Sequence, residues 1–236
     1  MAFKQFALTE QINVTIYKRR GSRHLHLRIM PDGMVRVTIP TWTPYATGLQ
    51  FAESKLEWIT TQRPTTQLLR DGLRIGKAHQ LRFASKAVQR PSGRLYANEA
   101  VVSLPLGMTA DHPAAQKAAE RLCIKALRLQ AEQLLPSRLA QLAQQHGFSY
   151  KTVRVKPMSS RWGSCDQHRN ITLNIFLMQL PWSAIDYVLL HELVHTKVLR
   201  HGPDFWTAFD RVLPSAKAER RAMRAYQPRL LTDLEA

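Results

Sequence analysis

The sequence predicts an α+β fold, and three observations lead to that prediction. Before about residue 108, short runs of alternating apolar and polar residues are bounded by Gly and Pro, as expected for strands. After that point, longer segments carry apolar residues at helical spacing. One of these later segments places two histidines one helical turn apart. We therefore expect a β-rich N-terminal part, residues 1–108, followed by an α+β core, residues 109–236.

The elements expected in the N-terminal part follow from the positions of these Gly and Pro residues. Pro31-Asp32-Gly33 is typical of a hairpin turn, and Thr43-Pro44 is typical of a helix start. The expected elements are strands at 12–18 and 23–40, a helix from 43 to 61, further strands at 73–85 and 94–105, and linkers at 63–70 and 107–113.

The core begins with the longest helical pattern, residues 113–145, which ends before Gly147 and carries Pro136 as a potential interruption. The apolar run from Ile171 to Leu177 follows a polar turn and predicts a strand. Pro181 begins the next helix. Two further helical patterns cover 204–209 and 215–226.

The most specific pattern is His191-Glu192-Leu193-Val194-His195, followed by His201. On a helix, His191 and His195 lie one turn apart on the same face and can bind one metal ion together. Glu192 lies beside the first histidine and can reach a water molecule without being a ligand itself. The five-residue motif arises by chance in roughly 1% of chains of this composition, so further support is needed.

His201 provides that support through a geometric condition. A continuous helix would carry it about 15 Å along the axis from His191, so it can bind the same ion only if the helix ends near Leu199 and the chain folds back. Residues 200–203, Arg-His-Gly-Pro, are a typical helix stop. A histidine on an apolar helix is more often a core residue, but a buried Glu192 between two histidines would be costly without a metal or a partner.

We therefore expect His191, His195 and His201 to bind a zinc ion whose fourth position is open to water. Glu192 would then be the general base in hydrolysis of a peptide bond. Arg161 and Tyr226 are candidate donors to the oxyanion, although a surface or core role is more common for either residue type.

A second motif, Arg161-Trp162-Gly163-Ser164-Cys165, precedes the expected strand. One interpretation is that Gly163 lets a peptide substrate approach an exposed strand edge, and the other is that Trp162 is a core aromatic and Gly163 a bulge. Cys165 could in principle be a nucleophile or a ligand. With Cys123 as the one other cysteine, a small and partly buried residue is the simpler interpretation.

The motifs together resemble the YgjP-like metallopeptidases, which are relatives of the SprT-type zincins. The resemblance is carried by the Arg161–Cys165 run, the HELVH segment, residues 201–206 (His-Gly-Pro-Asp-Phe-Trp), and the N-terminal pattern Arg19-Arg20, Leu27-Arg28, Pro31-Asp32-Gly33 and Pro40. It implies a small zincin-like core with the motif on a helix, a third histidine downstream and a strand that lines the cleft.

The resemblance also implies that His191, His195 and His201 are ligands and that Glu192 is the catalytic base. The metzincins share the spacing of the three histidines, but they have Gly where this chain has Val198, and no methionine-turn is clear. We therefore do not assign the chain to the metzincins.

Composition leaves alternatives to a peptidase open. The 34 Lys and Arg against 17 Asp and Glu give a net charge of +17, which attracts polyanions, although solvated basic surfaces account for part of it. One alternative is a zinc hydrolase of an anionic non-peptide substrate, such as a nucleotide pyrophosphatase. The other is a basic module that contacts nucleic acid electrostatically and therefore in a salt-sensitive way.

Location and partners are constrained more weakly. Two distant cysteines give no disulfide framework, and no run is apolar enough for a leader or a membrane span. We expect a cytoplasmic protein that acts on peptides or proteins and has no membrane partner. The sequence does not give the oligomeric state.

Overall fold

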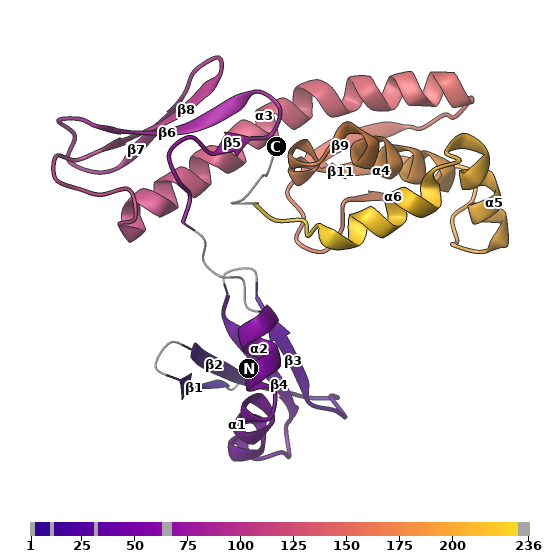
Figure 1. The fold of residues 1–236 in the computed structure, drawn as a ribbon. Coiled ribbons are helices and arrows are strands. Elements are labelled where there is room, and N and C mark those ends of the chain that lie inside the picture. Colours follow the sequence, from indigo (N-terminus) through magenta and orange to yellow (C-terminus); the bar gives the residue numbers. More distant parts are fainter. Residues whose placement is uncertain (1–2, 10–11, 31–32, 63–67, 231–236) are drawn as a thin grey trace. The chain divides into compact units, whose positions relative to one another are not determined.

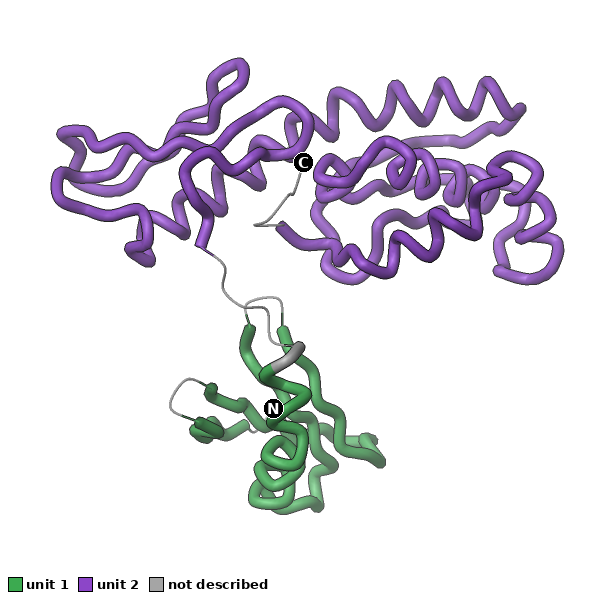
Figure 2. Tube along the Cα trace, viewed as in Figure 1, with its two compact units in different colours: residues 1–67 green, residues 68–236 purple. Residues whose placement is uncertain are grey.

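The computed structural model describes residues 3–9, 12–30, 33–62 and 68–230 (Figure 1). The chain divides into two compact units, residues 1–67 and residues 68–236 (Figure 2). Each unit combines helices with small sheets, one in unit 1 and two in unit 2 among the described residues, around its own hydrophobic core, which confirms the expected α+β class. Within the described residues, no helix has both the length and the apolar character needed to cross a bilayer.

Unit 1 is a four-stranded sheet, in the order β1-β2-β4-β3, with helices packed against it. Its elements are β1 (Phe3–Thr9), β2 (Ile12–Arg19), β3 (His26–Ile29), β4 (Val35–Pro40), α1 (Tyr45–Glu53) and α2 (Leu56–Gln62). The central strands β2 and β4 run parallel, and their buried residues Val14, Ile16 and Val37 form the core with Ala52. The single helix expected at 43–61 is therefore two helices, and Pro31 and Asp32 of the expected turn lie outside the described residues.

Unit 2 is organised along one long helix, α3 (Pro113–His146), as Figure 1 shows. A second four-stranded sheet, in the order β5-β6-β8-β7, packs on its first half. Its strands are β5 (Arg74–Ile75), β6 (His79–Ser85), β7 (Ser92–Leu95) and β8 (Glu99–Leu104). Pro136 does not interrupt α3, which ends at Gly147 in the left-handed conformation.

The division between the units differs from the expected boundary near residue 108. The break falls between residues 67 and 68, so the second sheet belongs to unit 2. The physical reason is the apolar face of α3. Leu81 and Val102 of the sheet are fully buried in the same core as Ala119 and Leu127 of the helix. Residues 63–67 of the expected linker lie outside the described residues.

The second half of α3 packs against the part of unit 2 that contains the histidine motif. Within the described residues, this part consists of a three-stranded sheet in the order β10-β11-β9, three α-helices and two 3-10 helices. The elements are β9 (Thr152–Lys156), β10 (Gly163–Cys165), β11 (Asn170–Asn174), the 3-10 helix η1 (Ile175–Gln179), α4 (Trp182–His195), α5 (Pro203–Val212), α6 (Ala216–Ala222) and the 3-10 turn η2 (Met223–Ala225).

The strand expected at 171–177 ends early, at Asn174. The Asn174 side-chain oxygen accepts a hydrogen bond from the backbone N–H of Phe176 and caps η1. Residues 175–177 are therefore the start of a 3-10 helix, and they are buried, which explains why their apolar pattern resembles a strand.

Candidate metal centre

The three motif histidines meet at the end of α4. His191 and His195 lie one turn apart on this helix, and their Nε2 atoms are 3.2 Å apart. The Nε2 atom of His201 lies 3.0 Å from that of His195 and 2.9 Å from that of His191. The chain therefore folds back as the sequence predicted, and all three side chains offer a nitrogen to one point.

The reversal that brings His201 back begins earlier than expected. α4 ends at His195, whereas we expected its end near Leu199. The Thr196 hydroxyl donates a hydrogen bond to the Leu193 carbonyl, and the Thr196 backbone N–H also points to that oxygen. Because these bonds span three residues and not four, the last turn tightens and the helix stops.

The protonation of His195 follows from its surroundings. Its Nδ1 lies 3.0 Å from the carbonyl oxygen of Val198. A carbonyl only accepts hydrogen bonds, so Nδ1 carries the proton and Nε2 presents its lone pair to the other histidines. The residue that separates this chain from the metzincin pattern, Val198, thus orients a candidate ligand through its backbone.

Three facing imidazole nitrogens fit a cation better than they fit one another. Each neutral Nε2 is either a donor or an acceptor, so a triangle of three always leaves at least one contact between two groups of the same kind. Zinc bonds of 2.0–2.1 Å in tetrahedral geometry would separate the nitrogens by roughly 3.3 Å, close to the spacings observed. The donor set therefore suits a metal ion.

The surroundings of His191 and His195 favour their neutral forms. Burial, together with positive charge at His195, His201 and Arg220, lowers the pKa of His191 to about 3. Burial also lowers the pKa of His195. Metal binding requires the neutral imidazole, so burial prepares both residues to act as ligands near neutral pH.

Glu192 is buried beside the histidines without a hydrogen bond to its Oε2 atom among the described residues. Burial raises the pKa of its carboxyl to about 8, and the positive charge of Arg161 opposes that rise. An unpaired carboxylate in this position is costly unless a cation or a water molecule approaches it.

Gly163 of β10 lies directly against Glu192. A Cβ atom at Gly163 would come within 2.7 Å of the Glu192 Oε1 atom, so a glycine is required for this close approach. Gly163 pairs in regular register with Leu173, which excludes the bulge interpretation. Trp162 is half-buried and packs against the core, as one of the two interpretations expected.

Asn174 is a site residue that the sequence did not indicate. Its side chain is fully buried, and its Nδ2 atom donates to the carbonyls of Met158 and Arg161 at 2.7 and 2.8 Å. The loop before β10 is therefore fixed, and with it the position of Gly163 over Glu192. The position of Asn174 within an otherwise apolar strand pattern was the sequence feature that could have indicated this role.

Aromatic residues surround the histidines on the other side. The ring centroids of Phe205 and His195 are 4.5 Å apart, and those of Trp206 and His201 are 6.0 Å apart. Tyr187, one turn before His191, lies 6.1 Å from it, and burial raises the pKa of its phenol. Its spacing from His191 could have identified it, because i and i+4 share a helix face.

The remaining candidate residues are Cys165, Tyr226 and Arg161. Cys165 is half-buried, and burial together with the charge of Glu192 raises the pKa of its thiol to about 11, so it is a neutral thiol at physiological pH. Tyr226 follows η2 and packs half-buried against the core. Arg161 is exposed, and its charge acts on Glu192.

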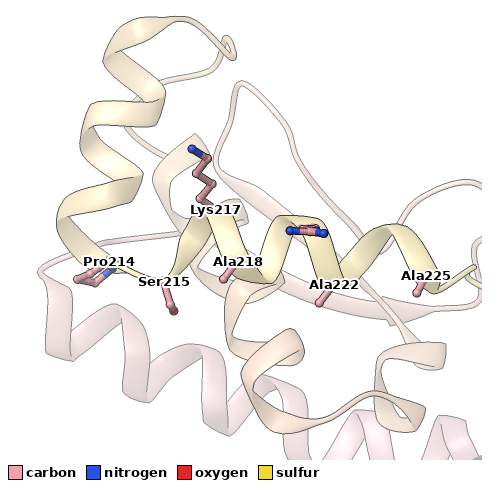
Figure 3. Close-up of a pocket in the computed structure, with 7 residues that line it drawn as sticks. Pro214, Ser215, Lys217, Ala218, Ala222 and Ala225 are labelled. Carbon is pink, nitrogen blue, oxygen red and sulfur yellow. The ribbon is translucent and has the colours of Figure 1, made fainter.

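A pocket of about 760 Å³ lies along α6, where Lys217, Ala218 and Arg221 are among its lining residues (Figure 3). None of the motif histidines lines it. We therefore take the converging nitrogen atoms, and not this pocket, as the candidate functional site.

Comparisons with known proteins identify the family to which this chain is similar. The model of one family, described as YgjP-like, metallopeptidase domain, matches residues 23–226. A comparison with the curated proteins found no match. A crystal structure of the metallopeptidase zymogen abylysin from Pyrococcus abyssi is 25% identical, and the similarity covers 42% of this chain and 100% of that one, with a TM-score of 0.37. A crystal structure of the metallopeptidase zymogen jannalysin from Methanocaldococcus jannaschii is 16% identical, and the similarity covers 39% of this chain and 94% of that one, with a TM-score of 0.35. Because the family match spans most of the sequence, this chain belongs to the YgjP-like family of metallopeptidase domains.

Proposed function

We propose that this chain is a zinc-dependent peptidase in which His191, His195 and His201 hold the ion and Glu192 is the general base. The observation that carries the proposal is the triangle of Nε2 atoms 2.9 to 3.2 Å apart, next to a buried carboxylate with an unpaired oxygen. Nitrogen donors of this kind favour zinc among the common divalent ions.

The residues around the ion divide the work of peptide hydrolysis. When bound, zinc supplies a Lewis acid that polarises the scissile carbonyl and acidifies a water molecule. Glu192 takes a proton from that water and later passes it to the leaving amine. Gly163 helps because it has no side chain that would displace the carboxylate, and Arg161 is a candidate donor to the oxyanion because its charge acts on Glu192.

Other expectations from composition stay predictions. They are a cytoplasmic location and electrostatic contact between this basic chain and nucleic acid, and both are compatible with a peptidase. A salt titration of DNA and RNA binding tests the second, because phosphate contacts weaken steeply as salt rises.

The test of the proposed function is Glu192→Gln in the full chain. We expect hydrolysis of an unfolded protein substrate to fall by roughly 100-fold or more, because a general base contributes 10²–10⁴-fold, while zinc content stays near one ion per chain. The matched control is Glu132→Gln, an exposed glutamate on α3, which should leave the rate unchanged.

Two results would contradict the proposal. Full activity in Glu192→Gln would exclude this residue as the base. Hydrolysis of nucleoside triphosphates, but not of protein, that depends on Glu192 would favour the alternative of an anionic non-peptide substrate.

A further inference from the structure

Arg220 on α6 is held close to the candidate metal centre by an aromatic side chain. Its guanidinium carbon lies 4.5 Å from the centroid of the Trp206 ring, which is a cation–π contact. The Trp206 ring is in turn 6.0 Å from that of His201 and 6.4 Å from that of His191. The guanidinium therefore lies within roughly three residues of extended peptide from the histidines.

The stacked guanidinium has no carboxylate partner within the described part of the chain. No ion pair joins Arg220 to Asp204 or Asp210 of α5, or to Glu219 beside it. Two other arginines of unit 2 show what a paired guanidinium looks like: Arg138 binds both carboxylate oxygens of Asp186, and Arg82 binds Asp71 and Glu99. Arg220 thus keeps its planar set of donors available although its side chain is positioned.

The charge of Arg220 acts inside the site. It contributes to the lowered pKa of His191, and it opposes the rise in the pKa of Tyr187 that burial causes. The charge of Arg161 acts on Glu192 of the same site. A substrate at the histidines is therefore exposed to two guanidinium charges, so negative charge near the scissile bond would be favoured.

We propose that Arg220, positioned on Trp206, is a specificity-determining residue that binds a carboxylate of the peptide substrate. This inference rests on the proposed peptidase function and adds the class of peptide to it. The planar fork of guanidinium donors matches a carboxylate in bidentate geometry, and an aromatic platform reduces the freedom lost on binding. The carboxylate comes either from an Asp or Glu side chain or from the free C-terminus of the peptide.

The experiment compares pairs of peptides that differ by one Glu-to-Gln replacement, placed at each position in turn, with free or amidated C-termini. Wild type should cleave the carboxylate peptide about tenfold more efficiently than its neutral partner, as expected for one charge-assisted contact. Arg220→Gln should abolish that preference, so that the ratio of kcat/KM for the carboxylate peptide to that for its neutral partner falls from about ten to about one. Preference that follows the Glu or the terminus identifies the source of the carboxylate.

Two further variants separate recognition from a structural role. Arg221→Gln changes the neighbouring exposed arginine on the same helix and should retain the preference. Arg220→Glu should favour a peptide with Lys at the position where wild type favours Glu, because the sign of the charge is reversed. A merely structural role would not produce this reversal.

The proposal is overturned if wild type shows no preference, if the preference persists in Arg220→Gln, or if every peptide loses rate equally while zinc content is unchanged. Calorimetric binding of the same peptides to the zinc-loaded protein provides a readout that does not need turnover. If no peptide is cleaved, the proposed function fails. Loss in Arg220→Gln of tighter carboxylate-peptide binding would then still support the carboxylate site, and equal binding of both peptides would exclude it.

Discussion

Unit 2 contains two buried polar clusters with histidine, and they differ in how their polar atoms are satisfied. Around Gln130 of α3, the Nε2 atom lies 2.9 Å from the Ile75 carbonyl and 2.8 Å from His79 Nδ1, and Oε1 accepts from the Lys77 N–H at 2.6 Å. Around Glu192, by contrast, one carboxylate oxygen and the Nδ1 atom of His191 have no partner among the described residues.

This difference supports the proposal that the Gln130 cluster stabilises the fold and that the Glu192 cluster binds an ion. A buried polar network in which every polar atom has a hydrogen-bond partner in the chain stabilises the structure. A network whose lone pairs converge without partners suits a bound ligand that supplies the missing contacts. Each cluster lies against a glycine, Gly76 or Gly163, at which a Cβ would overlap the neighbouring side chain. Beside Gly76, the Gln130 oxygen accepts a hydrogen bond, whereas beside Gly163 the Oε2 atom of Glu192 has no partner among the described residues.

The largest effect that tests this comparison is loss of zinc. We expect His201→Ala to weaken zinc binding, because it removes a ligand. The loss should exceed the roughly 10–100-fold that results when a residue hydrogen-bonded to a ligand is removed. His79→Ala, which alters the other cluster, should keep one zinc per chain. Elemental analysis at neutral pH and competition with a chelator measure both. Zinc retained in His201→Ala would show that the third ligand lies elsewhere.

A smaller effect should come from the satisfied cluster. Gln130→Ala leaves the Lys77 N–H, the Ile75 carbonyl and His79 without their partner, so we expect a loss of about 2–4 kcal/mol in the free energy of unfolding. The loss should be the same with and without zinc. Urea unfolding measures it, with Gln133→Ala, an exposed position on the same helix, as the control. Recovery of the lost stability by zinc would show that the clusters are coupled.

The sequence predicted the incomplete cluster better than its surroundings. The spacing of His191, His195 and His201, together with the helix stop at residues 200–203, was enough to place three nitrogens at one point, because helix geometry and a Gly-Pro break are local properties. Trp206 and Arg220 could not be joined in the same way. Their contact depends on how α5 and α6 pack, which no local spacing reports.

The fold shows the same division between local and distant causes. α3 was predicted closely because its apolar spacing continues across Pro136. β1 was missed, because most of its residues are exposed and leave no alternating pattern. The expected boundary near 108 differs from the division between residues 67 and 68, because the strands before and after residue 67 look alike in sequence and the packing of the later strands on α3 is not a local property.

The smallest expected effect concerns pH and the metal-free protein. The pKa of Glu192 is about 8 in the folded chain, against an ordinary value of 4.5. Between these values the unfolded chain has lost the proton while the folded chain keeps it. The unfolded state then binds fewer protons, so stability falls as pH rises through this window and levels off above about pH 8. His191 has the opposite dependence, because its lowered pKa costs stability only below 6.5.

Glu192→Gln removes the first dependence and leaves the second. The metal-free variant should therefore match wild type near pH 4.5 and become more stable than wild type by about 1–3 kcal/mol near pH 8. Urea unfolding in the presence of a chelator, at several pH values, measures the difference, from which the contribution of His191 cancels. With zinc bound the advantage should shrink, because the ion compensates the buried charge. If the stability difference between the variant and wild type did not change with pH, the Glu192 carboxylate would have its interactions satisfied within the chain. The two clusters would then not differ in the way described.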